Sequence, residues 1–371
     1  MRLAHWQGKA FAILFLVLAA AWNAAGDSGE ASRLYEQAHR LMDEAEGSRA
    51  KLLQAAEILS ELQQKFPESE LSWILAGRLI LKAGYINRTN YSEESLKLSV
   101  QYFHKALAIN PDSLDTMVFS AYPYLYQGDL ENAKRRAGVA AEIDPDAVRL
   151  LFLQGDIAHK EKDWQEEIRL AKRVLASTDD PLFTGFAYSD LANAYRVTKQ
   201  YGKAEHYYLK IIELKPDSAW SLINYGSFLV KRGEYDKAID ILNRSMQITE
   251  SGMGHHLLAK AWYGKGRKLY WEDGKPAEGV KSFKNVLRHD PDHANALYGL
   301  GLYYYRKGHQ SKDQVELYRA EGYYKRAIEA DPEHEQAIAQ LARLQKLLGW
   351  LKKHPAQKKP VKPFTSPPSQ G

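Results

Sequence analysis

The feature that most constrains the fold is a turn signature that recurs about every 34 residues. A proline followed by an acidic residue stands at Pro111-Asp112, Pro145-Asp146, Pro216-Asp217, Pro291-Asp292 and Pro332-Glu333. The first two prolines are 34 residues apart, the next spacing is 71 (about two periods), and the last is 41 (one period plus an insertion). A fixed period of this length indicates an array of repeated supersecondary units, each burying its apolar face against the next.

Between these prolines, small and aromatic residues hold recurring positions. The small ones let two helices approach closely, and they include Gly226, Gly301, Ala204 and Ala238. The aromatic ones fill the gaps between successive helix pairs, and they include Tyr195, Tyr208, Tyr304 and Phe283. Gly128 and Gly233 are placed to end the first helix of a pair, because glycine accepts the left-handed C-cap conformation. The pattern predicts antiparallel helical hairpins without strands.

In period and in these positions the chain resembles the tetratricopeptide-repeat family over residues 34–333, about eight units. The resemblance implies an all-α solenoid, a right-handed superhelix of helical hairpins whose first helices line a concave groove. It also implies binding of a protein or peptide partner in that groove, with no cofactor. After Pro332, apolar residues at helical spacing predict a capping helix, which would close the solenoid domain of residues 27–351: Ile338, Leu341, Leu344, Leu347, Leu348 and Leu351.

The two ends of the chain differ from its middle. Residues 1–26 read as a signal peptide, with Arg2 and Lys9 before an apolar run Ala10–Trp22 and small residues ahead of Asp27. That run is shorter than the roughly 20 residues that span a bilayer. Residues 352–371 carry five lysines among prolines and are expected to be a disordered tail, open to contact with a membrane or another anionic surface.

The net charge of +5 arises at the ends, which contribute +2 and +5, so residues 27–351 carry −2. A near-neutral body lacks the basic footprint of nucleic-acid binding. There are no cysteines, and no metalloprotease, phosphate-loop or nucleophile motif is present. His289 and His293 fall in a repeat turn and are interpreted as structural residues of that turn. His255-His256 fall in an insertion and are interpreted as exposed loop residues. The sequence predicts neither enzyme nor metal site. The alternative of a catalytic site within the insertions near 86–93, 251–259 and 310–316 stays open.

The register of the resembled family also proposes groove residues. The inward positions are Phe119, Tyr122, Phe152, Phe186, Asn193, Arg196, Trp220, Asn224, Lys265, Trp271, Tyr298 and Tyr305. Some family members clamp a peptide carboxyl terminus with two asparagines, lysines and an arginine. In those members the two asparagines have the same separation in sequence as Asn193 and Asn224. Lys265 stands at the arginine's position, but Ser189 and Ala261 replace the lysines. The full carboxylate clamp is therefore absent.

These observations predict a periplasmic or secreted adaptor that holds a protein segment during envelope assembly or secretion. Two alternatives remain. In the first, the amino-terminal apolar segment is retained and the protein is a membrane-anchored assembly factor. In the second, the aromatic groove binds a carbohydrate or surface polymer.

Overall fold

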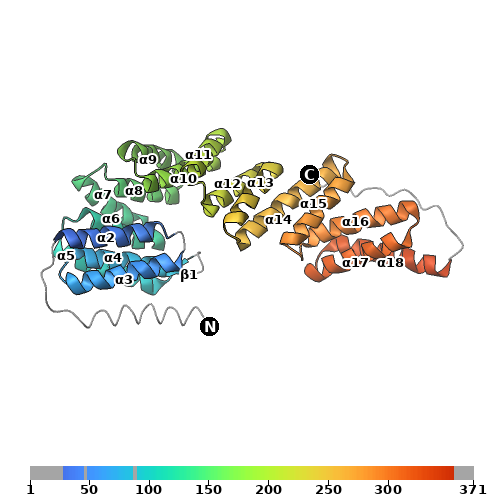
Figure 1. Cartoon of the computed structure of the whole chain (residues 1–371), viewed down its shortest axis with the longest axis horizontal. Coiled ribbons are helices and arrows are strands. Elements are labelled where there is room, and N and C mark those ends of the chain that lie inside the picture. Colours follow the sequence, from blue (N-terminus) through green and yellow to red (C-terminus); the bar gives the residue numbers. More distant parts are fainter. Residues whose placement is uncertain (1–27, 46–47, 87–89, 355–371) are drawn as a thin grey trace. The chain divides into compact units, whose positions relative to one another are not determined.

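The computed structural model describes residues 28–45, 48–86 and 90–354 of the 371-residue chain. These residues form helices in sequence order, with one short strand pair (Figure 1). The predicted signal peptide and the lysine-rich tail, apart from its first residues, lie outside the described part of the chain.

The helices follow one another as hairpins, which confirms the predicted all-helical repeat. Eight pairs are α2 (Ser28–Asp43) with α3 (Arg49–Lys65), α4 (Glu70–Ala83) with α5 (Glu93–Ile109), α6 (Leu114–Gln127) with α7 (Leu130–Ile143), α8 (Val148–Glu161) with α9 (Trp164–Ser177), α10 (Pro181–Val197) with α11 (Tyr201–Leu214), α12 (Ala219–Arg232) with α13 (Tyr235–Ile248), α14 (Gly252–Arg267) with α15 (Pro276–His289), and α16 (Ala294–Ser311) with α17 (Gln314–Ala330). A π-helical turn, η1 (Lys268–Glu272), extends α14, and α18 (Glu335–Lys353) follows the last pair.

Turn chemistry follows the repeat. Gly128 and Gly233 end α6 and α12 with φ of 85° and 76°, the left-handed conformation expected of them. After the turns, Asp129 and Asp163 accept hydrogen bonds from backbone N–H groups at the starts of α7 and α9. Such caps satisfy donors that the helix leaves unpaired, so each hairpin begins and ends where its sequence directs.

The three insertions take different forms. The first contains the two-residue antiparallel strands β1 (Tyr85–Ile86) and β2 (Asn90–Tyr91), a departure from the strand-free expectation. The second is helical, so the prediction of His255 and His256 as loop residues is wrong: both lie in α14, where Nδ1 of His255 is 3.1 Å from Nδ1 of His289. The third lengthens α16 and α17 to 18 and 17 residues.

The chain divides into two compact units, one ending at Tyr207 and the other beginning at Tyr208, within α11. In the first unit, one hydrophobic cluster joins α2 to α6 around Met42, Ile74 and Phe103. In the second unit, α16, α17 and α18 share a cluster around Tyr324. Leu344 and Leu348 of α18 are buried in it, as predicted for a capping helix, whereas Ile338 is exposed.

Close helix packing inside the hairpins depends on glycine. A Cβ at Gly226 would lie 2.6 Å from Leu242, and a Cβ at Gly301 would lie 2.5 Å from the Tyr324 ring. Tyr324 is fully buried, so its ring has nowhere to move. Gly322, on the paired helix α17, is exposed, and a Cβ added to it would meet no atom within 4 Å.

This contrast gives a test within one hairpin. Gly301→Ala should reduce the free energy of unfolding by about 1–3 kcal/mol, because it overpacks the contact with Tyr324. Gly322→Ala should leave stability unchanged or raise it by about 0.5–1 kcal/mol, because alanine favours a helix interior. Chemical denaturation followed by circular dichroism measures both. Equal stability of the two variants would contradict the packing described here.

Candidate functional site

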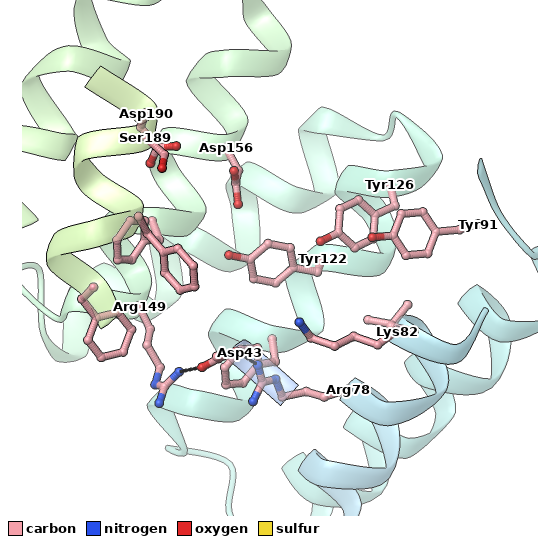
Figure 2. A pocket seen from close by; sticks show the side chains of 15 residues that line it. Asp43, Arg78, Lys82, Tyr91, Tyr122, Tyr126, Arg149, Asp156, Ser189 and Asp190 are labelled. Carbon is pink, nitrogen blue, oxygen red and sulfur yellow. Dashed lines mark hydrogen bonds and ion pairs between the residues drawn. The ribbon is translucent and has the colours of Figure 1, made fainter. Parts of the chain in front are cut away.

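The first unit contains a concave pocket of about 350 Å³ (Figure 2). Its walls come from strand β2 and from the first helices of five consecutive hairpins, α2, α4, α6, α8 and α10. We call it the first-helix pocket, and define it by Asp43, Arg78, Leu81, Lys82, Tyr91, Phe119, Tyr122, Tyr126, Arg149, Phe152, Asp156, Phe183, Phe186, Ser189 and Asp190. Seven aromatic rings, three basic groups and three acidic groups therefore face one cavity.

The repeat explains why these side chains converge. Three of the helices each contribute residues at positions i, i+3 and i+7, which lie on one helix face: Phe119, Tyr122 and Tyr126 on α6; Arg149, Phe152 and Asp156 on α8; Phe183, Phe186 and Asp190 on α10. The α8 and α10 sets are related by one 34-residue period. Successive hairpins stack in the same orientation, so residues at the same position of successive first helices face the same side. Together they form one wall of the pocket.

The basic end of the pocket is organised by one carboxylate. Asp43 accepts hydrogen bonds from Arg78, at 2.5 Å, and from Arg149, at 3.2 Å, and so joins α2, α4 and α8. Burial alone would raise the pKa of Asp43, but the two guanidinium groups and Lys82 outweigh it and lower the pKa. The Arg78 guanidinium also lies 4.1 Å from the centre of the Phe119 ring. Arg78 and Arg149 are thereby held in place before any ligand arrives.

Lys82 lies beside this network and points into the cavity (Figure 2). Its side chain is accessible to water in the pocket, yet protein surrounds the ammonium group on several sides. This burial, reinforced by Arg78, lowers the pKa of Lys82 to about 8. The group still carries a proton at neutral pH, so the basic end presents a positive charge to a ligand.

The acidic end lies on the opposite side of Tyr122 (Figure 2). Desolvation raises the pKa of Asp156 to about 6, against the opposing interaction with the Tyr122 hydroxyl. Desolvation also raises the pKa of Asp190, and the charges of Asp156 and Glu167 reinforce that shift. Both carboxylates are reached by water through the mouth of the pocket, but the surrounding helices restrict their hydration. The pocket is thus dipolar, with basic and acidic groups at separate ends.

The first insertion supplies one wall of the pocket. Tyr91 of β2 stacks on Tyr126 of α6, with ring centres 4.0 Å apart and planes inclined by 7°. Tyr85 of β1 also packs against Tyr91, with ring centres 4.9 Å apart. The strand pair therefore places an extra ring beside the first helices.

Several predicted groove residues do meet at this site. Phe119, Tyr122, Phe152 and Phe186 all line the first-helix pocket. Ser189, which replaces a clamp lysine, lines it as well. Asn193 and Arg196 lie further along α10, where the Arg196 guanidinium donates a hydrogen bond to the Asn193 side-chain oxygen. The side chains of Asn193 and Arg196 are therefore hydrogen-bonded to each other.

The remaining predicted residues belong to the second unit. Trp220 and Asn224 are exposed on α12, Trp220 with 48% of its surface accessible. Lys265 is paired with Asp236. Trp271 lies in η1, exposed but touching Phe283.

Two further groove predictions fall at the last hairpin. Tyr298 is buried against Tyr324 and His334, so it serves the core and offers little surface to a partner. Tyr305 is half-buried and packs against the cluster of α16, α17 and α18.

Sequence reasoning missed the charged residues of the pocket. Asp156 and Asp190 follow Phe152 and Phe186 by four residues, and the two pairs are 34 residues apart. That repetition was available as a signal. Asp43, Arg78 and Lys82 carry no such signal, because no residue of the same type stands 34 residues away from any of them.

Over the described ranges, no helix is long and apolar enough to cross a membrane. In the same part of the chain, no group of three or more histidine, aspartate or glutamate side chains is arranged to hold a metal ion.

Comparison with known proteins places the repeats in a family. Sequence models described as tetratricopeptide repeat match residues 121–181 and 268–335, 187–218 and 207–240. "Tetratricopeptide repeat protein 8" of Caenorhabditis elegans is 26% identical over 167 residues, which is 45% of this chain and 31% of that protein. The chain thus matches about a third of the length of this relative.

Solved structures share the fold at low identity. The human IFIT1 dimer solved with m7Gppp-AAAA is 13% identical, with a TM-score of 0.50, over 86% of this chain and 72% of that one. A Pseudomonas aeruginosa pilF structure is 19% identical, with a TM-score of 0.46, over 61% and 93% of the two chains. Likeness at this level concerns the helical fold alone.

The Asp43 network predicts a large stability effect. Asp43→Ala should reduce the free energy of unfolding by about 3–5 kcal/mol, because it leaves Arg78 buried without its counter-charge. Glu166→Ala, which removes an exposed ion pair with Arg169, should cost about 1 kcal/mol or less. Urea denaturation at pH 7 measures both.

The pH dependence has a defined sign. Because the folded protein lowers the pKa of Asp43, its stabilisation is present above the unfolded pKa of about 3.9 and is lost as the pH falls below it. The difference between wild type and Asp43→Ala should therefore shrink in acid. A difference that stays constant down to pH 3 would contradict the ionic role of Asp43.

Proposed function

We propose that this chain, which belongs to the tetratricopeptide-repeat family, is a non-enzymatic scaffold that holds an extended segment of a partner protein in the first-helix pocket. The observation that carries the proposal is the composition of that pocket. Rings from four elements supply apolar contact area, and charged groups of both signs stand at separate ends. Such a mixture suits a peptide, because anchors come from aromatic pockets and orientation comes from a few polar groups.

Binding is favoured over catalysis by the state of the pocket's polar groups. The only hydroxyl nucleophile of the serine or threonine type in the pocket, Ser189, donates its hydrogen bond to the backbone oxygen of Gly185, at 3.0 Å, and not to a base. Arg78 and Arg149 are tied to Asp43. The acidic residues therefore serve recognition in this proposal.

The binding proposal predicts which side chains anchor the partner. Phe152→Ala and Phe186→Ala should each weaken partner affinity by about 2 kcal/mol or more, the loss expected of a central aromatic anchor. Val139→Ala, an exposed apolar residue on the second helix α7, should leave affinity unchanged. The partner is first captured from an extract of the native source, and its affinity for each variant is then measured by calorimetry. Normal binding by both phenylalanine variants would overturn the assignment of the pocket.

We also propose that the protein is exported and works in envelope assembly or secretion, in the periplasm or outside the cell. This rests on the signal-peptide pattern of residues 1–26. The alternative, a membrane-anchored assembly factor, keeps that segment. Asn193, Arg196, Trp220, Asn224, Lys265 and Trp271 remain candidate contacts for longer partner segments, and the lysines of residues 352–371 remain candidate contacts for an anionic surface.

Export has a direct test. The mature protein should begin near Asp27 and fractionate as a soluble protein, because the apolar segment would be removed. Amino-terminal sequencing of the protein purified from its native host decides the matter. A membrane-bound protein that still carries residues 1–26 would contradict the proposal of export as a soluble protein. It would support the alternative of a membrane-anchored assembly factor.

A further inference from the structure

The acidic end of the first-helix pocket is built twice from the same local pattern. Phe152 and Asp156 are one turn apart on α8, and Phe186 and Asp190 are one turn apart on α10. The two rings touch each other, with centres 6.0 Å apart in an edge-to-face arrangement. Two first helices, α8 and α10, thus each carry a carboxylate one turn after a phenylalanine, and the two phenylalanine rings are in contact.

These carboxylates lack ion pairs like those that Asp43 makes at the basic end, although the charges of His159 and Lys160 lower the pKa of Asp156. Within the described ranges no ion pair joins Asp156 or Asp190 to a basic residue. Tyr122 interacts with Asp156, whereas the neighbours that perturb Asp190 are themselves acidic, Asp156 and Glu167. Glu167 faces His159, at 3.2 Å, and so the nearest histidine is directed to a third carboxylate. Like charges gathered in a partly dehydrated cavity cost free energy in the empty protein.

A cation supplied by a ligand would remove that cost. We propose that the acidic end of the first-helix pocket binds a basic side chain, lysine or arginine, of the partner segment. Its carbon stem packs on Phe152 and Phe186, and its charged head lies between Asp156 and Asp190. A cation near aromatic rings gains further attraction from their faces, and long basic side chains bury their stems in this way. This inference rests on the proposed function and names the chemistry that the pocket selects.

The basic end gives the bound segment a direction. Lys82, Arg78 and Arg149 repel a cation, so a basic side chain entering the pocket is directed across Tyr122 to the acidic end.

The same geometry makes binding pH-dependent. The pKa of Asp156 is about 6 and that of Asp190 is raised, so both gain protons as the pH falls and lose their attraction for a cation. The other groups that interact with this end are Tyr91 from β2, Tyr122 and Tyr126 from α6, His159 and Lys160 from α8, and Glu167 from α9. Affinity for a basic segment should rise with pH.

The test is a selection from a library of random 12-residue peptides displayed on phage, with the full chain immobilised at pH 8. Peptides enriched by the wild type should share a lysine or arginine at one position. Asp156→Asn combined with Asp190→Asn should abolish this preference. Glu131→Gln combined with Glu142→Gln removes two acidic charges at exposed positions of α7, outside the pocket; this variant should retain the preference and is the matched control.

An enriched peptide then allows a test that does not depend on a protein variant folding. Replacing its basic residue with norleucine, which keeps the carbon chain and removes the charge, should weaken binding to the wild type at least tenfold in fluorescence anisotropy. The parent peptide should bind at least tenfold more weakly at pH 5 than at pH 8, and the norleucine peptide should show little change.

The outcomes separate this inference from the proposed function. Enriched peptides without a shared basic residue, or a basic preference that survives in the double variant, would overturn the inference and leave segment binding intact. Failure to enrich any peptide would overturn segment binding in this pocket, and the inference with it.

Discussion

The structure depends on the close approach of paired helices at small residues. Gly301 lies against the ring of Tyr324, and Gly226 lies against Leu242, at separations that admit no side chain. Each hairpin leaves one apolar face that must be covered by the next hairpin. Stacking therefore repeats the orientation of the first helix, and every residue at an equivalent position faces the same way. The pocket walls are a direct consequence of this repetition.

Repetition also explains how a scaffold of ordinary helices acquires a specific site. Arg149 and Phe183, Phe152 and Phe186, and Asp156 and Asp190 are three pairs separated by one period. The first pair places a guanidinium group beside an aromatic ring. The second pair brings two aromatic rings into contact, and the third pair supplies the two carboxylates of the acidic end. The Arg149 guanidinium lies 5.3 Å from the centre of the Phe183 ring. Changing one position per repeat is enough to change the ligand, because the backbone that carries the side chains stays the same.

The two ends of the pocket differ in how far their charges are balanced by ion pairs within the protein. At the basic end, Asp43 binds two guanidinium groups and completes a network that stabilises the fold. At the acidic end, Asp156 and Asp190 gather like charge. His159 and Lys160 act on Asp156, but no ion pair within the described helices joins either aspartate to a basic side chain. Groups that stabilise a fold are usually satisfied by it, whereas groups that destabilise an empty site are commonly satisfied by a ligand. This difference separates the structural half of the pocket from the half that we assign to recognition.

The amino-acid sequence by itself determined the repeat. Proline-acid turns, helix-ending glycines and the small and aromatic positions are local or periodic signals, and they identified the hairpins and the capping helix. The same register selected Phe119, Tyr122, Phe152 and Phe186, which line one pocket because first helices of successive hairpins present equivalent faces. It could not show that Tyr298 is buried, because burial depends on how α17 and α18 close over it.

Only the tertiary structure decided the charge distribution of the pocket. Asp43 meets Arg149 across 106 positions of sequence, and no local pattern links them. Tyr91 reaches Tyr126 only because the first insertion folds into a strand pair instead of a loop. The shifted pKa values of Asp156 and Lys82 arise from helices that surround them, and desolvation is a property of the assembled cavity. A sequence states which groups are present, but their charges interact through distances that exist only after the chain has folded.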